Sequence, residues 1–440
     1  MADITDRIHR MSYSIERLMA ISGTPGVAIG VMIKDNPISY NNHGFRDVER
    51  KLPVTEDTIF PICSLTKGIT AVGIGLLVEE KRVSWDSLIK DILPDFCSVN
   101  PVLHNNTTIT DILCHRTGMG WGDNAILGTA DLSSGHSVLN LATTTSTTNW
   151  LALSFNDALE NASTVPIDFL RMGDGGYGAA SGGARSSVKD LVKLYSSFIK
   201  GFNTQFSGSA TPDDGSPLKQ LNHIMSAKIP FNQPSQHEAS SAFGWGKVQL
   251  PGRFGHIGLN PALLLDMPTI GRGTSSLVLF HQGSLPGSLT FVALLPETET
   301  VIVVLTNSLA LNDAADWIGQ LIIEDIVNVP SELRTDFIGL AQAAVAKNLK
   351  CHSQIVDDKL YWLMYGLETE MFELVHYHED TFTWLQPRDE LVSRGRWVRS
   401  GQGATFWEVK FEASESATID KLIWVPDSEL PPMAYTKTRE

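Results

Sequence analysis

The pattern of apolar positions predicts both helices and strands in the first three quarters of the chain. The continuous apolar run 26–33 predicts a buried strand, and a turn at Asn36-Pro37 leads to a second strand at 38–40. The runs 288–295 and 300–305 predict a hairpin near the end of this part. An amphipathic helix is expected at the N-terminus, with a face formed by Ile8, Met11, Ile15 and Leu18.

Helices are expected between these strands. The segments 65–81 and 186–201 carry apolar residues at helical spacing, and Ser186-Ser187 would cap the second helix. Residues 203–241 are rich in Ser, Pro, Gln and Asn and are interpreted as a surface excursion. A sheet formed from both ends of a domain, with helices between them, is an α+β architecture.

The pattern changes after about Pro330. From residue 360 onward, short aromatic runs are separated by polar turns, which predicts a small β-barrel or sandwich. Five of the ten tryptophans lie in this last quarter, and we interpret these aromatic strands as core rather than ligand contacts. We therefore predict two domains, a catalytic one at 1–330 and a β-rich accessory one at 331–440.

Composition excludes several classes of function. With 34 basic and 49 acidic residues, the net charge is -15, which disfavours binding to nucleic acid or to an anionic membrane surface. The polar N-terminus has no apolar core of the kind that a secretory signal needs, and no long apolar run predicts a membrane span. We therefore expect a cytoplasmic protein, with four scattered, reduced cysteines: Cys63, Cys97, Cys114 and Cys351.

No metal or other cofactor is expected. The densest group of possible ligands is His376-Tyr377-His378-Glu379-Asp380, where His376 and His378 would point to one face of a strand. We interpret them as surface histidines, with a zinc site as the alternative.

The most informative chemistry lies in the segment FPICSLTKGITA at 60–71. Ser64 and Lys67 are three residues apart and would share one face of a helix whose N-terminus lies at Ser64. A serine hydroxyl is a weak nucleophile until a base takes its proton, and a partly desolvated lysine can be that base. Alone, this spacing is a weak motif, and a capping serine with a solvent-facing lysine is its more common interpretation.

An ordered series of blocks makes the catalytic interpretation stronger. The chain resembles the family of class C serine β-lactamases, D-alanyl-D-alanine carboxypeptidases and their esterase and acyltransferase relatives. The resemblance extends over about residues 20–310. Its blocks are TIF (58–60), VSWDS with LPDF (83–96), ITDILCHRTG (109–118), SGGARSSVKDL (181–191) and HQGSLPG (281–287).

The resemblance implies a β-lactamase/transpeptidase-like sheet flanked by helices, and roles for particular residues. Ser64 would be the nucleophile, and the backbone N–H groups of Ser64 and Ser284 would form an oxyanion hole. His281 and Gly283 form the third motif on an edge strand, where the glycine leaves room for substrate. Histidine in place of lysine argues against a dedicated β-lactamase; the alternative for His281 is a surface histidine at a strand end.

One family motif has no clear counterpart. Relatives carry Y-x-N, whose tyrosine assists proton transfer, but the interval between Gly118 and Gly182 contains no such sequence. Tyr177 is its only tyrosine and is the candidate for this role; the alternative is that Lys67 works alone. Because acid–base assistance contributes about 10²–10⁴-fold, loss of the tyrosine would give a weak or inactive enzyme.

The sequence thus predicts an SxxK-type serine hydrolase or transesterase that acts on a small-molecule ester or amide through an acyl-Ser64 intermediate. A lipase-type G-x-S-x-G elbow is absent from the sequence. The alternatives are an acyltransferase in natural-product biosynthesis and a catalytically silent member that binds a ligand or partner. The sequence does not predict the oligomeric state.

Overall fold

The computed structural model describes residues 4–34, 36–94, 96, 98, 100–118, 149–155, 162–168, 179–207, 216–231, 235–255, 257–264, 266–285, 287–307, 311–348, 360–363, 371–387, 390, 404–413, 419–425 and 432–436. The chain divides into two compact units. The first contains residues 1–118 and 178–345, and the second contains residues 119–177 and 346–440. The domain boundary at residue 330 stays a prediction.

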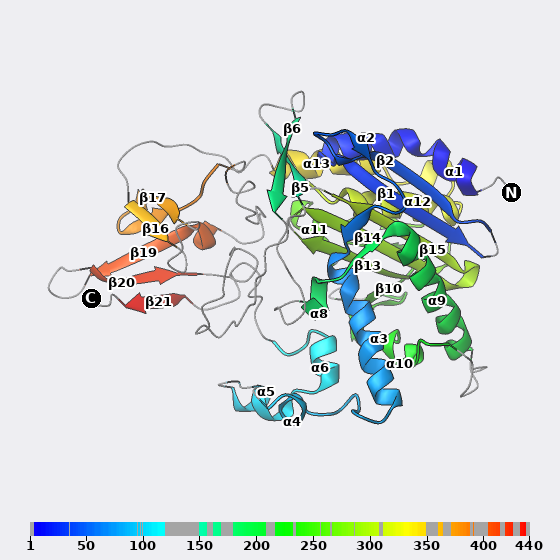
Figure 1. Ribbon diagram of the computed structural model, residues 1–440, viewed down its shortest axis with the longest axis horizontal. Helices are drawn as coiled ribbons and strands as arrows, with labels where there is room; N and C mark the ends of the chain where they lie inside the picture. Colours follow the sequence, from blue (N-terminus) through cyan, green and yellow to red (C-terminus); the bar gives the residue numbers. More distant parts are fainter. Residues whose placement is uncertain are drawn as a thin grey trace. The chain divides into compact units, whose positions relative to one another are not determined.

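An antiparallel sheet forms the centre of the first unit (Figure 1). Its strand order is β3-β2-β1-β15-β14-β13-β10-β9-β8, so strands from both ends of the unit meet in the middle. The strands are β1 (Gly26–Ile33), β2 (Ser39–Asp47), β3 (Leu52–Pro53), β8 (Ile229–Pro230), β9 (Ala239–Ala242), β10 (Trp245–Gln249), β13 (Leu277–Leu285), β14 (Ser288–Leu295) and β15 (Thr300–Thr306). Every residue of β14 and β15 is buried, because helices cover both faces of the sheet.

Helices pack on both faces of this sheet. A Cβ added at Gly30 of β1 would meet Val192 of α9 (Val188–Phe206), and one added at Gly319 of α12 (Ala314–Ile326) would meet Phe291 of β14. Since Gly30 and Phe291 lie on opposite faces by the strand register, α9 and α12 cover opposite faces. The other helices are α1 (Ile4–Arg10), α2 (Ser12–Ser22), α3 (Thr66–Glu79), α4 (Ile89–Ile92), α5 (Pro101–Asn106), α6 (Ile109–Leu113), α8 (Ala179–Gly182), α10 (Leu221–Ile224), α11 (Asn260–Leu263) and α13 (Phe337–Asn348).

These elements confirm the predicted α+β class, with local differences. The N-terminal helix is divided at Met11 into α1 and α2, and the second strand extends to Asp47. The interval 203–241 is not only a surface excursion, since it contains the end of α9 together with α10, β8 and most of β9. Polar composition misleads there because β8 and β9 lie at the sheet edge, where side chains stay partly in water. Within the described ranges, no helix is long and apolar enough to cross a membrane.

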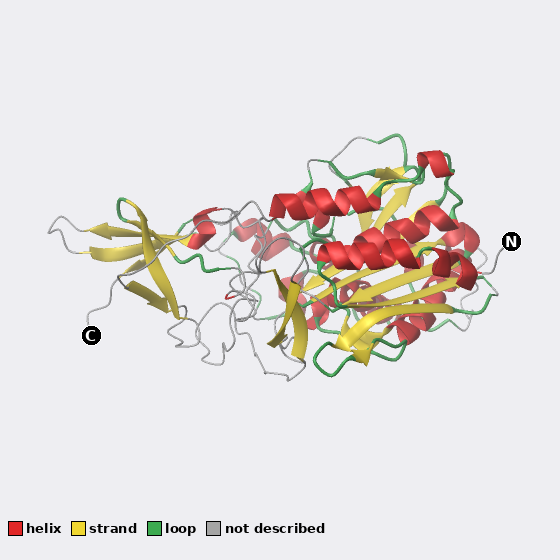
Figure 2. Cartoon of the chain, turned by 90° about the horizontal axis from the view of Figure 1, so that it is seen from above, coloured by secondary structure: helices red, strands yellow, loops and turns green. Residues whose placement is uncertain are grey.

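The second unit contains a separate antiparallel sheet in the order β16-β17-β18-β19-β20-β21, which curls into a half-barrel (Figure 2). Its strands are β16 (Leu360–Leu363), β17 (Met371–His378), β18 (Thr381–Thr383), β19 (Glu408–Ala413), β20 (Ile419–Trp424) and β21 (Met433–Thr436). This unit also contains the hairpin of β5 (Asn149–Phe155) and β6 (Ala162–Asp168). The β-rich tail that the sequence predicts is therefore present.

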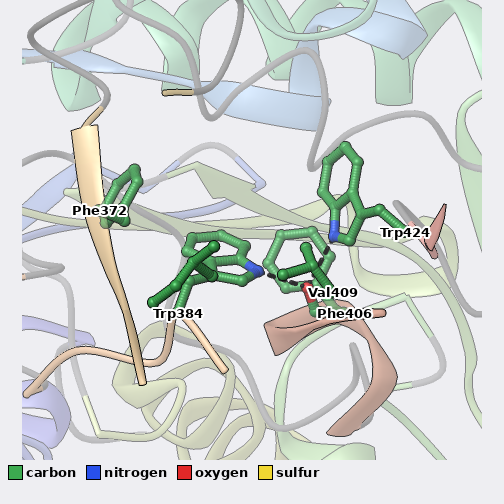
Figure 3. Close-up of a cluster of buried hydrophobic side chains, with 6 residues drawn as sticks. Phe372, Trp384, Phe406, Val409 and Trp424 are labelled. Atoms are coloured by element: carbon green, nitrogen blue, oxygen red, sulfur yellow. Dashed lines mark hydrogen bonds between the residues drawn. The ribbon is translucent and has the colours of Figure 1, made fainter. Parts of the chain in front are cut away.

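The core of the half-barrel is aromatic (Figure 3). The indole N–H groups of Trp384 and Trp424 both donate to the carbonyl oxygen of Phe406, at 2.9 and 2.8 Å. Two buried polar groups, one just after β18 and one at the end of β20, are thus satisfied by one acceptor. On β17, a register shift between His376 and His378 breaks the simple alternation that would place them on one face, and both are exposed. The described residues contain no group of three possible metal ligands.

Candidate active site

Ser64 lies in a tight turn at the start of α3. The strand β4 (Ile59–Pro61) pairs with β7 (Arg185–Ser187), and the one-turn helix η1 (Cys63–Leu65) follows it directly. Cys63 has a φ of 51°, a left-handed conformation that non-glycine residues rarely adopt. The hydroxyl of Thr66 donates to the carbonyl of Cys63 at 2.7 Å and accepts the backbone N–H of Ala184 at 3.2 Å, which holds the turn. Backbone strain of this kind is typical of functional sites.

Lys67 contacts the serine directly. Its Nζ donates to Ser64 Oγ at 2.8 Å and to the carbonyl of Ser181 at 3.1 Å. One helical turn later, the hydroxyl of Thr70 donates to the carbonyl of Ala180 at 2.6 Å. The predicted pair is therefore in hydrogen-bond contact, and α8, from the SGGA block, orients the lysine.

The third block lies against the turn. Strand β10 pairs with β13 only as far as Phe280, whereas β14 pairs with β13 to Leu285. Beyond Phe280, one side of β13 therefore has no strand partner in the described part of the chain. The turn η1 packs against β13 and β14. The strand is interior to the sheet, so the prediction of an edge strand was wrong; only its last five residues behave like an edge.

Gly283 allows β13 to approach this closely. A Cβ at this position would lie 2.2 Å from Thr290 Oγ1, 2.8 Å from the Cys63 Cβ and 2.9 Å from the Ile62 carbonyl oxygen. The Thr290 hydroxyl donates to that carbonyl at 3.2 Å, and the Ser288 hydroxyl donates to the Pro61 carbonyl at 3.0 Å. Two side chains of β14 thus fasten the segment before Ser64 to the sheet.

His281 is a buried, neutral residue on the same face of the sheet as α9. Only 5% of it is exposed, so its interpretation as a surface histidine is wrong. Burial, and then the positive charge of Lys67, lower the pKa of His281 to about 3. Because Nδ1 contacts the carbonyl of Gln282, it carries the proton, which leaves the lone pair on Nε2.

The structure also identifies residues that the motif assignment left without a role. His115 has a left-handed backbone (φ 54°), and partial removal from water, followed by the charge of Lys67, lowers its pKa. His115 belongs to the 109–118 block, and its place in that block was the sequence signal that could have identified it as a candidate site residue. Burial raises the pKa of the thiol of Cys63, the residue before Ser64, to about 12, which makes this thiol unreactive.

Two predicted roles are not decided by this geometry. Tyr177 lies outside the described residues. Ser284 lies at the Ser64 end of β13 and is half-buried, but the assignment of its N–H to an oxyanion hole stays a prediction. Gln282, between His281 and Gly283, is fully buried and was not singled out from the sequence.

Comparison with known proteins agrees with this geometry. A family model described as Beta-lactamase matches residues 14–145, which include η1 and α3. This part of the chain is similar to the serine β-lactamase-related family. Two curated relatives are the serine beta-lactamase-like protein LACTB, mitochondrial, of Bos taurus and the unguisins hydrolase ungD of Aspergillus violaceofuscus. The first is 28% identical over 91 residues and the second 34% identical over 100 residues.

These matches are short. They cover 21% and 22% of this chain but only 15% and 18% of the two relatives, so most of each relative is not matched. An octameric penicillin-binding protein homologue from Pyrococcus abyssi shares the fold, with a TM-score of 0.54 and 17% identity. That similarity covers 98% of this chain and 96% of the other chain.

Proposed function

We propose that this chain is a serine hydrolase that cleaves a small ester or amide through an acyl-Ser64 intermediate. The observation that carries the proposal is the 2.8 Å contact between Lys67 Nζ and Ser64 Oγ in a turn at the N-terminus of a 14-residue helix. The helix dipole and the free N–H groups there favour developing negative charge. The match of residues 14–145 to the Beta-lactamase family model supports the same reaction class.

The proposed reaction has two halves. In the first, Lys67 acts as the base: once it has lost its own proton, its Nζ takes the proton of the Ser64 hydroxyl as the oxygen attacks the substrate carbonyl carbon. The tetrahedral intermediate collapses, the acyl–oxygen or acyl–nitrogen bond breaks, and the lysine returns the proton to the leaving group. In the second half, water gives a proton to Lys67 as it attacks the acyl carbon. The bond from that carbon to Ser64 Oγ then breaks, Lys67 returns the proton to Oγ, and the free acid leaves. An alcohol or amine in place of water would give acyl transfer.

The environment of His281 favours an uncharged acyl substrate. With a pKa of about 3, this histidine is neutral at physiological pH and adds no positive charge opposite Lys67. A neutral imidazole is a hydrogen-bonding group, so it supports a substrate that need not carry a carboxylate. This distinguishes the proposed activity from that of a dedicated β-lactamase.

One relative points to a substrate class. By its name, the Aspergillus relative is a hydrolase of unguisins. We propose by analogy that the substrate here is a natural-product ester or amide, with acyl transfer in natural-product biosynthesis as the second candidate. The two described cysteines, Cys63 and Cys114, are free thiols, which fits the proposed cytoplasmic location.

A panel of p-nitrophenyl esters and anilides tests the activity, and variants test the roles. We expect Lys67→Ala to lower kcat/KM far more than Tyr177→Phe, because the lysine contacts Ser64 directly. Equal losses would assign Tyr177 to proton transfer as well. Addition of an alcohol separates the two reactions, since a transferase would form the new ester in preference to the free acid. A folded protein that does not react with any of these substrates or with a fluorophosphonate would favour the silent member of the family.

A further inference from the structure

Gln282 lies at the centre of the third block, yet its side chain points away from Ser64. By the strand register, Gln282 is paired with Phe291 and shares its face of the sheet, whereas His281 is paired with Val292 on the other face. Phe291 packs against Gly319 of α12. The amide of Gln282 therefore faces α12, where it cannot contact a substrate bound at Ser64.

On that face, Gln282 meets a buried carboxylate. Its Nε2 donates to Asp316 Oδ1 at 2.8 Å; Gln320 Nε2 donates to the same oxygen at 2.9 Å, and Asn260 Nδ2 donates to Oδ2 at 2.8 Å. These four residues are at most 1% exposed. Burial raises the pKa of Asp316, and the three amide donors oppose that shift. A carboxylate with three donors is a satisfied acceptor in a region that water does not reach.

The carboxylate is itself fixed at the first turn of α12. Asp313 caps this helix and accepts the N–H of Asp316 at 3.0 Å. Asn260 also donates to the Asp313 carbonyl at 3.1 Å and accepts the Asp313 N–H at 2.9 Å. Asp316 therefore lies in a rigid frame formed by α11 and α12.

The end of β13 needs such a connection. Residues 281–285 have a ladder partner on one side only in the described part of the chain, because β10 stops pairing at Phe280. A strand held from one side can tilt toward or away from η1. The bond from Gln282 to Asp316 connects β13 to α12, two residues past Phe280, the last residue that pairs with β10.

We propose that the Gln282–Asp316 hydrogen bond positions the end of β13 against Ser64. Gln282 and Asp316 are then positioning residues for acylation: they act through His281 and Ser284 and do not contact the substrate. The inference rests on the proposed serine-hydrolase function for its kinetic test, but its structural test does not depend on activity.

The chain offers a matched pair of variants for this test. Gln282→Met and Gln320→Met each remove one amide donor from the same Asp316 oxygen, at equally buried positions. Of these two glutamines, Gln282 connects β13 to α12, whereas Gln320 lies on α12 itself. The measurements are the melting temperature, hydrogen–deuterium exchange of residues 279–286, and the rate of Ser64 labelling by a fluorophosphonate. If Gln282→Met does not fold, Gln282→Asn replaces it, because its amide is too short to keep the bond.

We expect both variants to lose similar melting temperature. Gln282→Met alone should speed exchange at 281–285 and slow Ser64 labelling by about 10- to 100-fold, the effect of a sub-ångström to 1 Å misplacement. Equal exchange and equal labelling in both variants would overturn the inference. If the folded wild-type protein is not labelled, the proposed function fails, while the exchange measurement still decides the positioning role.

A conservative change at the acceptor provides a second check. Gln282 and Gln320 each have an Oε1 without a hydrogen-bond partner, so both amides can rotate and accept from a new side-chain N–H. Asp316→Asn should therefore keep labelling within about threefold of wild type, whereas Asp316→Leu, which removes the acceptor, should slow it as Gln282→Met does. Slow labelling in Asp316→Asn together with normal labelling in Asp316→Leu would contradict a positioning bond.

Discussion

A single methyl group at residue 283 should separate the third block from the nucleophile. In Gly283→Ala the new Cβ would lie 2.2 Å from Thr290 Oγ1 and 2.9 Å from the Ile62 carbonyl oxygen, against an ordinary contact distance of at least 3.4 Å. Thr290 Oγ1 belongs to a side chain, but the Ile62 oxygen is backbone and cannot be displaced by rotation of a side chain. The strand or the turn must therefore move by about 0.5 Å, the difference between 2.9 and 3.4 Å. Overpacking of this kind costs about 1–3 kcal/mol of stability.

The same displacement affects chemistry, because the turn that must move carries Ser64. A misplacement of about 1 Å lowers a rate by roughly 10²-fold, so a shift of about half that size should slow acylation by about 10-fold. Urea denaturation gives the stability, and fluorophosphonate labelling gives the acylation rate. Gly73→Ala is the matched control: this glycine of α3 has nothing within 4 Å of its Cβ, so the change should stabilise the helix by about 0.5–1 kcal/mol and leave labelling unchanged. Normal stability and labelling in Gly283→Ala would refute the close approach of β13 to the turn.

Three further predictions concern groups whose environment the structure defines. Because the pKa of His281 is lowered to about 3, the unfolded chain binds a proton there below about pH 6.5 that the folded chain does not. This site should therefore lower the free energy of unfolding with decreasing pH by up to about 1.4 kcal/mol per unit. His281→Gln should make the slope in pH-dependent urea titrations shallower, and an unchanged slope would contradict the lowered pKa. Cys63, with a thiol pKa of about 12, should resist iodoacetamide at pH 8 in the native protein and react only after denaturation, as peptide mapping would show. Trp424→Phe should destabilise the second unit by about 1–3 kcal/mol, measured by thermal unfolding, since it removes one of two indole donors and part of a buried ring; a loss below 0.5 kcal/mol would contradict its place in the core.

Local patterns were sufficient to predict much of the fold. The apolar runs at 26–33, 288–295 and 300–305 correspond to β1, β14 and β15, because strands covered on both faces need continuous hydrophobic sequence. The edge strand β8 and its neighbour β9 carry no such signal, since their side chains remain partly in water. Strand β9 depends on tertiary pairing with β10, and β8 on pairing with β9, which a local pattern does not encode.

In the candidate site too, local spacing predicted some features and tertiary packing determines the others. The spacing of Ser64 and Lys67 predicted their contact, because a three-residue separation fixes their proximity on a helix. The burial of His281 and the opposite orientation of Gln282 could not be predicted, since both depend on where β10 stops pairing and where α12 packs. The strained backbone of Cys63 has no signature in its residue type.

The most direct test of the account is the mass of the protein after reaction with a slowly hydrolysed p-nitrophenyl ester, followed by peptide mapping. The account predicts the mass of one acyl group on the peptide that contains Ser64, formed with release of one equivalent of p-nitrophenol and abolished in Ser64→Ala. An acyl group on another residue, or equal p-nitrophenol release by wild type and Ser64→Ala, would contradict it.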